Sequence, residues 1–281
     1  MRLAGTTPAV LVACVAVLAL AGPASASLRP PNPCLNPIGE AELLCPDLIM
    51  QPPFGLYLDR GAKRGRVVLR AGNSIDNIGL GPAELHGVRT GRYLMRGRQR
   101  IYRRFGGRLR ITTGARLFFK FVPGQLRYWK YQRAAAFELW RLDSEGRRAR
   151  LARRGPKVSY CLRDLVHSRG RLHRSPAHRV YPACSTNPRQ RKVTIGTSVG
   201  WSDVYPPSYP EQWIDVTGLR GCFAYRQIAD PHNGIYESDE GNNSASAIVR
   251  LPYRPGRQRC PGRRSADAPP PAGDDPYDDA Y

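Results

Sequence analysis

Short runs of apolar, β-branched and aromatic residues recur along most of the chain, separated by Gly, Pro, Asn or Arg residues. Runs of this length with breakers between them are typical of β-strands joined by turns. The clearest runs are residues 67–70, 99–102, 109–113, 136–140, 158–162, 213–217, 222–226 and 247–251. The pattern predicts an all-β fold, an antiparallel Greek-key-like β-sandwich with long loops.

No long segment carries apolar residues at helical spacing, so we expect little helix. Residues 127–136 fit a turn or two of helix. Turn residues predict two breaks in the first half of the chain, one at Gly72-Asn73 and one at residues 79–82, which read Gly-Leu-Gly-Pro.

Residues 1–26 have the pattern of a secretory signal peptide. Arg2 supplies the positive start, residues 9–21 are apolar and uncharged, and Ala24-Ser25-Ala26 is a small-residue cleavage site. A transmembrane anchor is the alternative, but the run is shorter than the roughly 20 apolar residues that cross a bilayer. We therefore expect a secreted, extracellular protein with no membrane span in its mature chain.

Composition divides the remaining chain into three parts. Residues 27–46 are Pro-rich and predict an irregular N-terminal arm, and residues 47–253 carry the strand pattern of one domain. Residues 254–281 are first basic, then rich in Pro and Ala, and finally acidic. Because this last part has no apolar pattern, we expect it to form a disordered tail.

The cysteines indicate a disulfide-bonded protein. Cys14 lies in the predicted signal peptide, and an even number remains, which in an exported chain predicts three disulfides. Six cysteines allow 15 pairings. Proximity in the sequence favours one set of pairs: Cys34–Cys45, Cys161–Cys184 and Cys222–Cys260.

The formal net charge of +22 is carried mainly by arginine, since lysine occurs only at residues 63, 120, 130, 157 and 192. A basic surface attracts polyanions, so acidic extracellular polymers are one class of partner to expect. A general arginine bias on a solvated surface explains the same composition. No nucleic-acid-binding motif is present, and we expect no nucleic acid partner.

Three segments, in order, resemble the lysyl oxidase family. Lys157 followed by Val-Ser-Tyr-Cys-Leu-Arg-Asp resembles the segment around that family's quinone-forming lysine. Residues 200–205, with the Gln-Trp-Ile-Asp-Val-Thr run from Gln212, resemble the segment of its quinone-forming tyrosine. Residues 237–243, which read Glu-Ser-Asp-Glu-Gly-Asn-Asn, resemble its last hairpin. The resemblance covers roughly residues 47–253, most of the mature chain.

The resemblance implies a copper-dependent amine oxidase. In this family copper drives oxidation of the tyrosine, the lysine amine adds to its ring, and the resulting lysyl tyrosylquinone oxidises primary amines such as peptidyl lysine. Lys157 and Tyr205 occupy the positions of the cross-linked pair, and Asp203 is a candidate local base from its place in the sequence. The implied partners are primary amines or lysine-bearing proteins.

The copper ligands of the family are missing. Its bacterial members carry three histidines at alternating positions around a tryptophan, and copper prefers such imidazole ligands. The matching positions around Trp129 are Leu126, Tyr128 and Lys130. Leucine has no donor atom, a protonated lysine repels the ion, and a protonated phenol is a weak ligand. The remaining histidines fit no compact metal motif: His86, His167, His173, His178 and His232.

Three hypotheses about function follow. The first is a secreted lysyl oxidase-like protein that is catalytically degenerate because the copper histidines are replaced. The second is an active copper and quinone amine oxidase with an unrecognised ligand set. The third is a basic extracellular binding protein for acidic polymers. The absence of histidine from residues 126–131 favours the first hypothesis.

Overall fold

A computed structural model of the chain describes residues 30–122, 124, 126–257 and 259–261. The predicted signal peptide and the acidic end of the predicted tail lie outside these residues. None of the helices in the described part of the chain has the length and apolar character needed to cross a bilayer.

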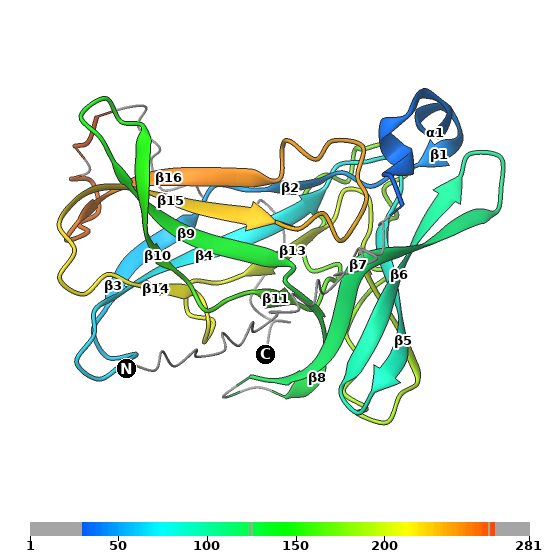
Figure 1. Cartoon of the computed structure of the whole chain (residues 1–281), viewed down its shortest axis with the longest axis horizontal. Helices are drawn as coiled ribbons and strands as arrows, with labels where there is room; N and C mark the ends of the chain where they lie inside the picture. The colour runs from blue at the N-terminus through cyan, green and yellow to red at the C-terminus, as the bar shows by residue number, and fades with distance from the viewer. Residues whose placement is uncertain (1–29, 123, 125, 258, 262–281) are drawn as a thin grey trace, which may run out of the picture. The chain divides into compact units, whose positions relative to one another are not determined.

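Three antiparallel sheets make up the domain (Figure 1), which confirms the predicted fold class. The first sheet runs in the order β11 (Ser159–Tyr160), β8 (Arg127–Gln132), β7 (Arg108–Phe121), β6 (Leu94–Arg103), β5 (Ala83–Gly91) and β12 (Lys192–Thr197), with β1 (Leu43–Leu44) paired to β6. The second runs in the order β10 (Arg148–Arg154), β9 (Ala135–Leu142), β15 (Gly221–Ala229) and β16 (Ser244–Leu251). The third surrounds β4 (Val68–Asn77) with β13 (Ser202–Tyr205), β14 (Trp213–Asp215), β2 (Leu48–Met50) and β3 (Phe54–Asp59).

One apolar core joins the three sheets. Leu117 on β7, Phe223 on β15 and Leu69 on β4 are fully buried and belong to the same cluster. Burial of large apolar side chains is the main favourable term in folding, so this cluster fixes how the sheets pack. The sheets in turn position the loops that carry the buried polar residues described below.

The helix expected at residues 127–136 is wrong, because residues 127–132 form strand β8. Trp129, Lys130 and Tyr131 are buried in succession, so the segment lacks the in-out alternation that marks a half-buried strand. The partner strand decides its conformation: β8 pairs with β7, and Trp129 lies opposite Phe119.

The turn expected at Gly72-Asn73 is also wrong, because both residues lie inside the continuous, fully buried strand β4. A Cβ atom at Gly72 would lie 2.4 Å from Cε2 of Phe54. The glycine is therefore needed for close packing within the sheet and does not mark a turn.

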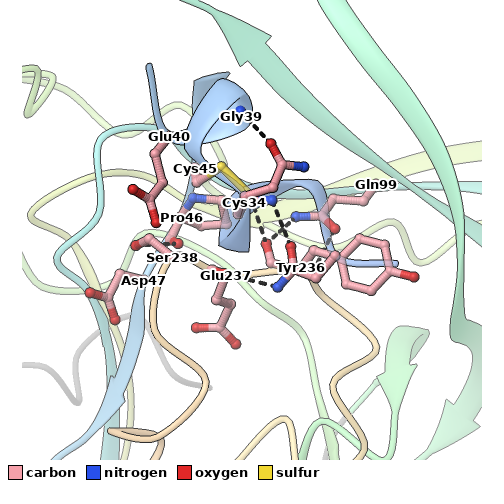
Figure 2. The surroundings of a disulfide bond; sticks show 12 residues. Cys34, Gly39, Glu40, Cys45, Pro46, Asp47, Gln99, Tyr236, Glu237 and Ser238 are labelled. Carbon is pink, nitrogen blue, oxygen red and sulfur yellow. Dashed lines mark hydrogen bonds between the residues drawn. A yellow bond between two sulfur atoms is a disulfide. The ribbon is translucent and has the colours of Figure 1, made fainter. Parts of the chain in front are cut away.

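The N-terminal arm, predicted to be irregular, contains two short helical segments, η1 (Pro33–Leu35) and α1 (Pro37–Glu42). The Asn36 side chain caps α1 by accepting a hydrogen bond from Gly39 N at 2.7 Å. Figure 2 shows the Cys34–Cys45 disulfide beside Tyr236, whose backbone exchanges two hydrogen bonds with the Gln99 side chain at 2.7 and 2.8 Å. Asn32 Nδ2 of the arm donates to the Glu237 carbonyl at 3.0 Å, which attaches the arm to the start of the last hairpin.

The three disulfides are Cys34–Cys45, Cys161–Cys184 and Cys222–Cys260. This confirms the pairing expected from sequence proximity. The third bridge and a hydrogen bond from Arg250 Nη1 to the Arg259 carbonyl at 3.2 Å attach the first residues of the predicted tail to β15 and β16.

Candidate functional site

Lys157 lies against three tyrosine rings inside the domain. Its side chain is fully buried, in the connection between β10 and β11. The Nζ atom lies 3.5 Å from the ring centroid of Tyr205, 3.7 Å from that of Tyr209 and 4.5 Å from that of Tyr160. Lys157 and Tyr205, which the sequence singled out, are therefore in contact.

Strand pairing and aromatic packing fix the position of Tyr205. It is the last residue of β13 and pairs with Asn73 on β4. Its ring packs edge-to-face against Tyr160 at 4.8 Å and Tyr209 at 4.9 Å between centroids. Its hydroxyl accepts a hydrogen bond from Cys161 N at 3.3 Å. This packing leaves a ring face of Tyr205 toward the lysine amine.

Strand β8 brings a second lysine to the cluster. Tyr128 and Lys130 alternate along β8 and both reach Tyr209. Lys130 Nζ donates to the Tyr209 hydroxyl at 2.9 Å, and the Tyr128 and Tyr209 hydroxyls lie 3.1 Å apart. Leu126, two residues before Tyr128, is 72% exposed and takes no part. The three positions matched to copper ligands thus reduce to two that face the site.

Burial controls the protonation of both lysines. Desolvation lowers the pKa of Lys130 to about 7, and the pKa of Lys157 falls well below its usual range through desolvation and the nearby Lys130. The sequence-based assumption that Lys130 carries a fixed positive charge therefore holds only below about pH 7. Desolvation also raises the pKa of the Tyr205 and Tyr209 phenols, so both remain protonated.

Asp203 and Glu211 are two acidic residues whose charges act on both lysines, and Asp203 is the one that the sequence singled out. It lies on β13 and is completely buried, and no donor among the described residues reaches either carboxylate oxygen. Desolvation raises its pKa to about 8, although Arg163, Lys157 and Lys130 oppose this shift. A carboxyl with this pKa can hold or release a proton near neutral pH, which is the property that a general base requires.

A family model for lysyl oxidase matches residues 90–257, more than half of the chain. The chain belongs to the lysyl oxidase family. The match includes β8, Lys157 and Tyr205. A search of curated proteins found no match. Family membership indicates, at a coarse level, the activity of lysyl oxidases, which is copper-dependent oxidation of amines.

The residues present in this lysyl oxidase-family chain do not fit copper. No group of three or more His, Cys, Asp or Glu residues in the described part of the chain could hold a metal ion. His86 lies beside Thr194 at 3.1 Å, and His167 stacks on Trp201 at 4.5 Å between ring centroids. Protonated phenols are poor ligands, and β8 supplies no imidazole.

Sequence reasoning missed Tyr209 and Tyr160, which complete the cluster. Tyr160 follows Lys157 within the segment that resembles the family, and Tyr209 lies between Tyr205 and Gln212 in the Tyr-Pro-Pro-Ser-Tyr-Pro loop. Two tyrosines in one short loop beside a candidate site are a signal that could have found Tyr209. Its contact with Lys130 spans 79 residues and depends on the fold.

Proposed function

We propose that this chain is a secreted lysyl oxidase-like protein that is catalytically degenerate at the copper site. The observation that carries the proposal is the position of Lys130. Its amine faces the site from the strand on which the family presents histidines, and it donates to Tyr209 at 2.9 Å. A single amine with two protonated phenols is not the imidazole set that copper requires.

Lys130, which stands at a position matched to a copper-binding histidine, makes contacts within the site but supplies no redox chemistry. Lys130 Nζ places a hydrogen-bond donor against the Tyr209 hydroxyl and also lies 4.6 Å from the ring centroid of Tyr128. It therefore joins β8 to the tyrosine cluster. An amine cannot accept electrons, so it does not replace copper in the oxidation of a tyrosine ring.

The fold does not depend on the metal. The core that joins the sheets is apolar, and the disulfides lie in the arm, the loop after β11 and the C-terminal segment. Because function depends on sites carried by a fold, loss of the ligands leaves the domain intact. The signal peptide pattern and the three disulfides support export, since disulfides persist in oxidising compartments.

The first test is metal analysis of protein secreted into copper-supplied medium, with intact mass measured on the same sample. We expect no stoichiometric copper and a mass that differs from the mature sequence only by the three disulfides. Stoichiometric copper with a mass change located at Lys157 and Tyr205 would refute the proposal and support an active oxidase with an unrecognised ligand set.

The second test restores the missing ligands. The variant Leu126→His/Tyr128→His/Lys130→His places histidines at the three matched positions, of which 128 and 130 lie on β8 and face the site, and we expect it to bind copper at least about tenfold more tightly than the unmodified protein. The matched control is Arg148→His/Arg150→His/Ala152→His, which places three histidines at alternating positions on β10. Equal copper affinity of the two variants would contradict the assignment of β8 as the lost copper strand.

A further inference from the structure

Arginines face one another across two strands of the first sheet. Strands β5, β6 and β7 lie side by side (Figure 1), and β6 pairs with β7 so that Arg96 lies opposite Arg116 and Arg100 opposite Arg110. Arg98 lies between the two pairs, opposite Thr112. The inward neighbours on β6 are buried, whereas these arginines are exposed or only partly buried. One outward face of the sheet therefore carries a row of guanidinium groups.

The arginine face includes the neighbouring strands. Its members are the outward residues of four strands: Arg96, Arg98, Arg100 and Tyr102 on β6; Arg108, Arg110, Thr112 and Arg116 on β7; Glu84 and His86 on β5; Lys192 and Thr194 on β12. Like charges directly opposite one another destabilise a sheet, so an arrangement with two arginine pairs has an energetic cost unless an anion lies between them.

Among the described residues, one carboxylate lies on this arginine face, that of Glu84, and three side chains already donate hydrogen bonds to it. Glu84 accepts from Arg100 at 2.7 Å, from Tyr102 at 3.0 Å and from Tyr181 at 2.7 Å. It neutralises Arg100 and leaves the other arginines of the face without an acidic neighbour on these strands. The face therefore has a net positive potential that an external anion can relieve.

The pKa of His86 is affected by the same positive charges. Its pKa is lowered by burial and then by the positive charges of Arg100, Lys192 and Arg110, against the opposing effect of Glu84. These groups lie on β5, β6, β7 and β12, so all four strands contribute to one field.

We propose that this arginine face binds a linear polymer of phosphate groups through Arg96, Arg98, Arg110 and Arg116. Guanidinium groups hold phosphate oxygens in pairs through their planar fork, and the hydroxyl of Thr112 adds an uncharged donor. Alternate residues on a strand are separated by about 6.8 Å and neighbouring strands by about 4.8 Å. An extended polymer can therefore contact several arginines at once. This binding does not depend on the proposed function of the buried site.

The test measures the affinity for long-chain inorganic polyphosphate at several salt concentrations. The face variant is Arg96→Gln/Arg98→Gln/Arg110→Gln. The matched control is Arg148→Gln/Arg150→Gln/Arg153→Gln, which removes the same charge from exposed positions on β10. We expect a loss of at least tenfold for the face variant and less than about threefold for the control. The slope of log affinity against log salt should fall by about 2 in the face variant alone.

Several outcomes would overturn the proposal. Equal losses in the two variants would assign the binding to bulk charge. Equal affinity of the unmodified protein for poly-glutamate would remove the preference for phosphate. Tighter binding of single-stranded DNA would assign the face to nucleic acid. If the triple variant does not fold, the single variants Arg98→Gln and Arg150→Gln make the same comparison with a smaller expected ratio of about threefold.

Discussion

Asp164 and Asp203 are both completely buried, yet their surroundings differ. Asp164 accepts hydrogen bonds from Val180 N at 2.8 Å, Tyr181 N at 3.1 Å, Ser198 N at 2.7 Å and Ser198 Oγ at 2.8 Å. No donor of the described residues reaches the carboxylate of Asp203. The first carboxylate satisfies the backbone around it, and the second is left for other chemistry.

The contrast separates the scaffold from the candidate site. Buried polar groups in folded proteins are nearly always paired, and an unpaired one is explained by a functional role, by strain or by a bound water or ion. Asp164 holds the loop after β11 to the end of β12, which a disulfide-bonded sandwich needs. Asp203 lies in the candidate site, where the charges of Lys157 and Lys130 act on it. The site thus contains a buried carboxyl that no donor of the described residues reaches.

The largest effect is expected from Asp164→Ala. The substitution leaves two buried N–H groups, one partly buried N–H group and one buried hydroxyl without this acceptor, at roughly 1–3 kcal/mol each. We expect the free energy of unfolding to fall by about 4 kcal/mol or more, measured by denaturant titration with the disulfides intact. The matched control, Asp203→Ala, should lower it by less than about 1 kcal/mol or raise it, because no hydrogen bond is lost and the cost of ionising a buried carboxyl is removed. Equal losses would remove the distinction between the two carboxylates.

The next effect is the pH dependence of Asp203. Its pKa is raised from 3.8 to about 8 in the folded state, so the unfolded state releases its proton first. Stability from this group is present below about pH 4 and is lost as the pH rises toward 8. Asp203→Asn removes the loss, and its advantage over the unmodified protein should grow by about 1 kcal/mol per pH unit between pH 5 and 8. A constant difference would mean that Asp203 is ionised in the fold.

The smallest of the three effects is expected from Lys130→Met. Burial lowers the pKa of Lys130 from 10.5 to about 7, so the unfolded state holds the proton more strongly. Stability from this group therefore rises between about pH 7 and 10. The advantage of the methionine variant should shrink by about 2 kcal/mol between pH 7.5 and 9.5. An advantage that stays the same over this window would show that the amine remains charged in the fold.

About half of the strands in the described residues could be predicted from the sequence, because their apolar residues stand between clear breakers. β8 and the second half of β4 could not, since both are buried on more than one side and lose the alternation of a half-buried strand. Gly72 appeared to be a turn residue because the sequence does not show that Phe54 packs against it. The disulfide pairs could be predicted because, within residues 34–260, the cysteines are bonded in consecutive pairs along the chain.

The candidate site was predictable in part. The family resemblance identified Lys157, Tyr205 and the positions Tyr128 and Lys130. It could not show that burial lowers the pKa of Lys130, because a residue's solvent exposure depends on packing between distant segments. The sequence also could not show that the Asp203 carboxylate lacks a hydrogen-bond donor, because this depends on the positions of all neighbouring groups in the fold.

The disulfides have a consequence for biosynthesis. The bridges close segments of 11, 23 and 38 residues that neither overlap nor enclose one another. As the chain is made from its N-terminus, each cysteine can pair before the next pair is synthesised, so the correct partner is also the first one to appear. Of the 15 pairings that six cysteines allow, this one makes the least demand on an isomerase.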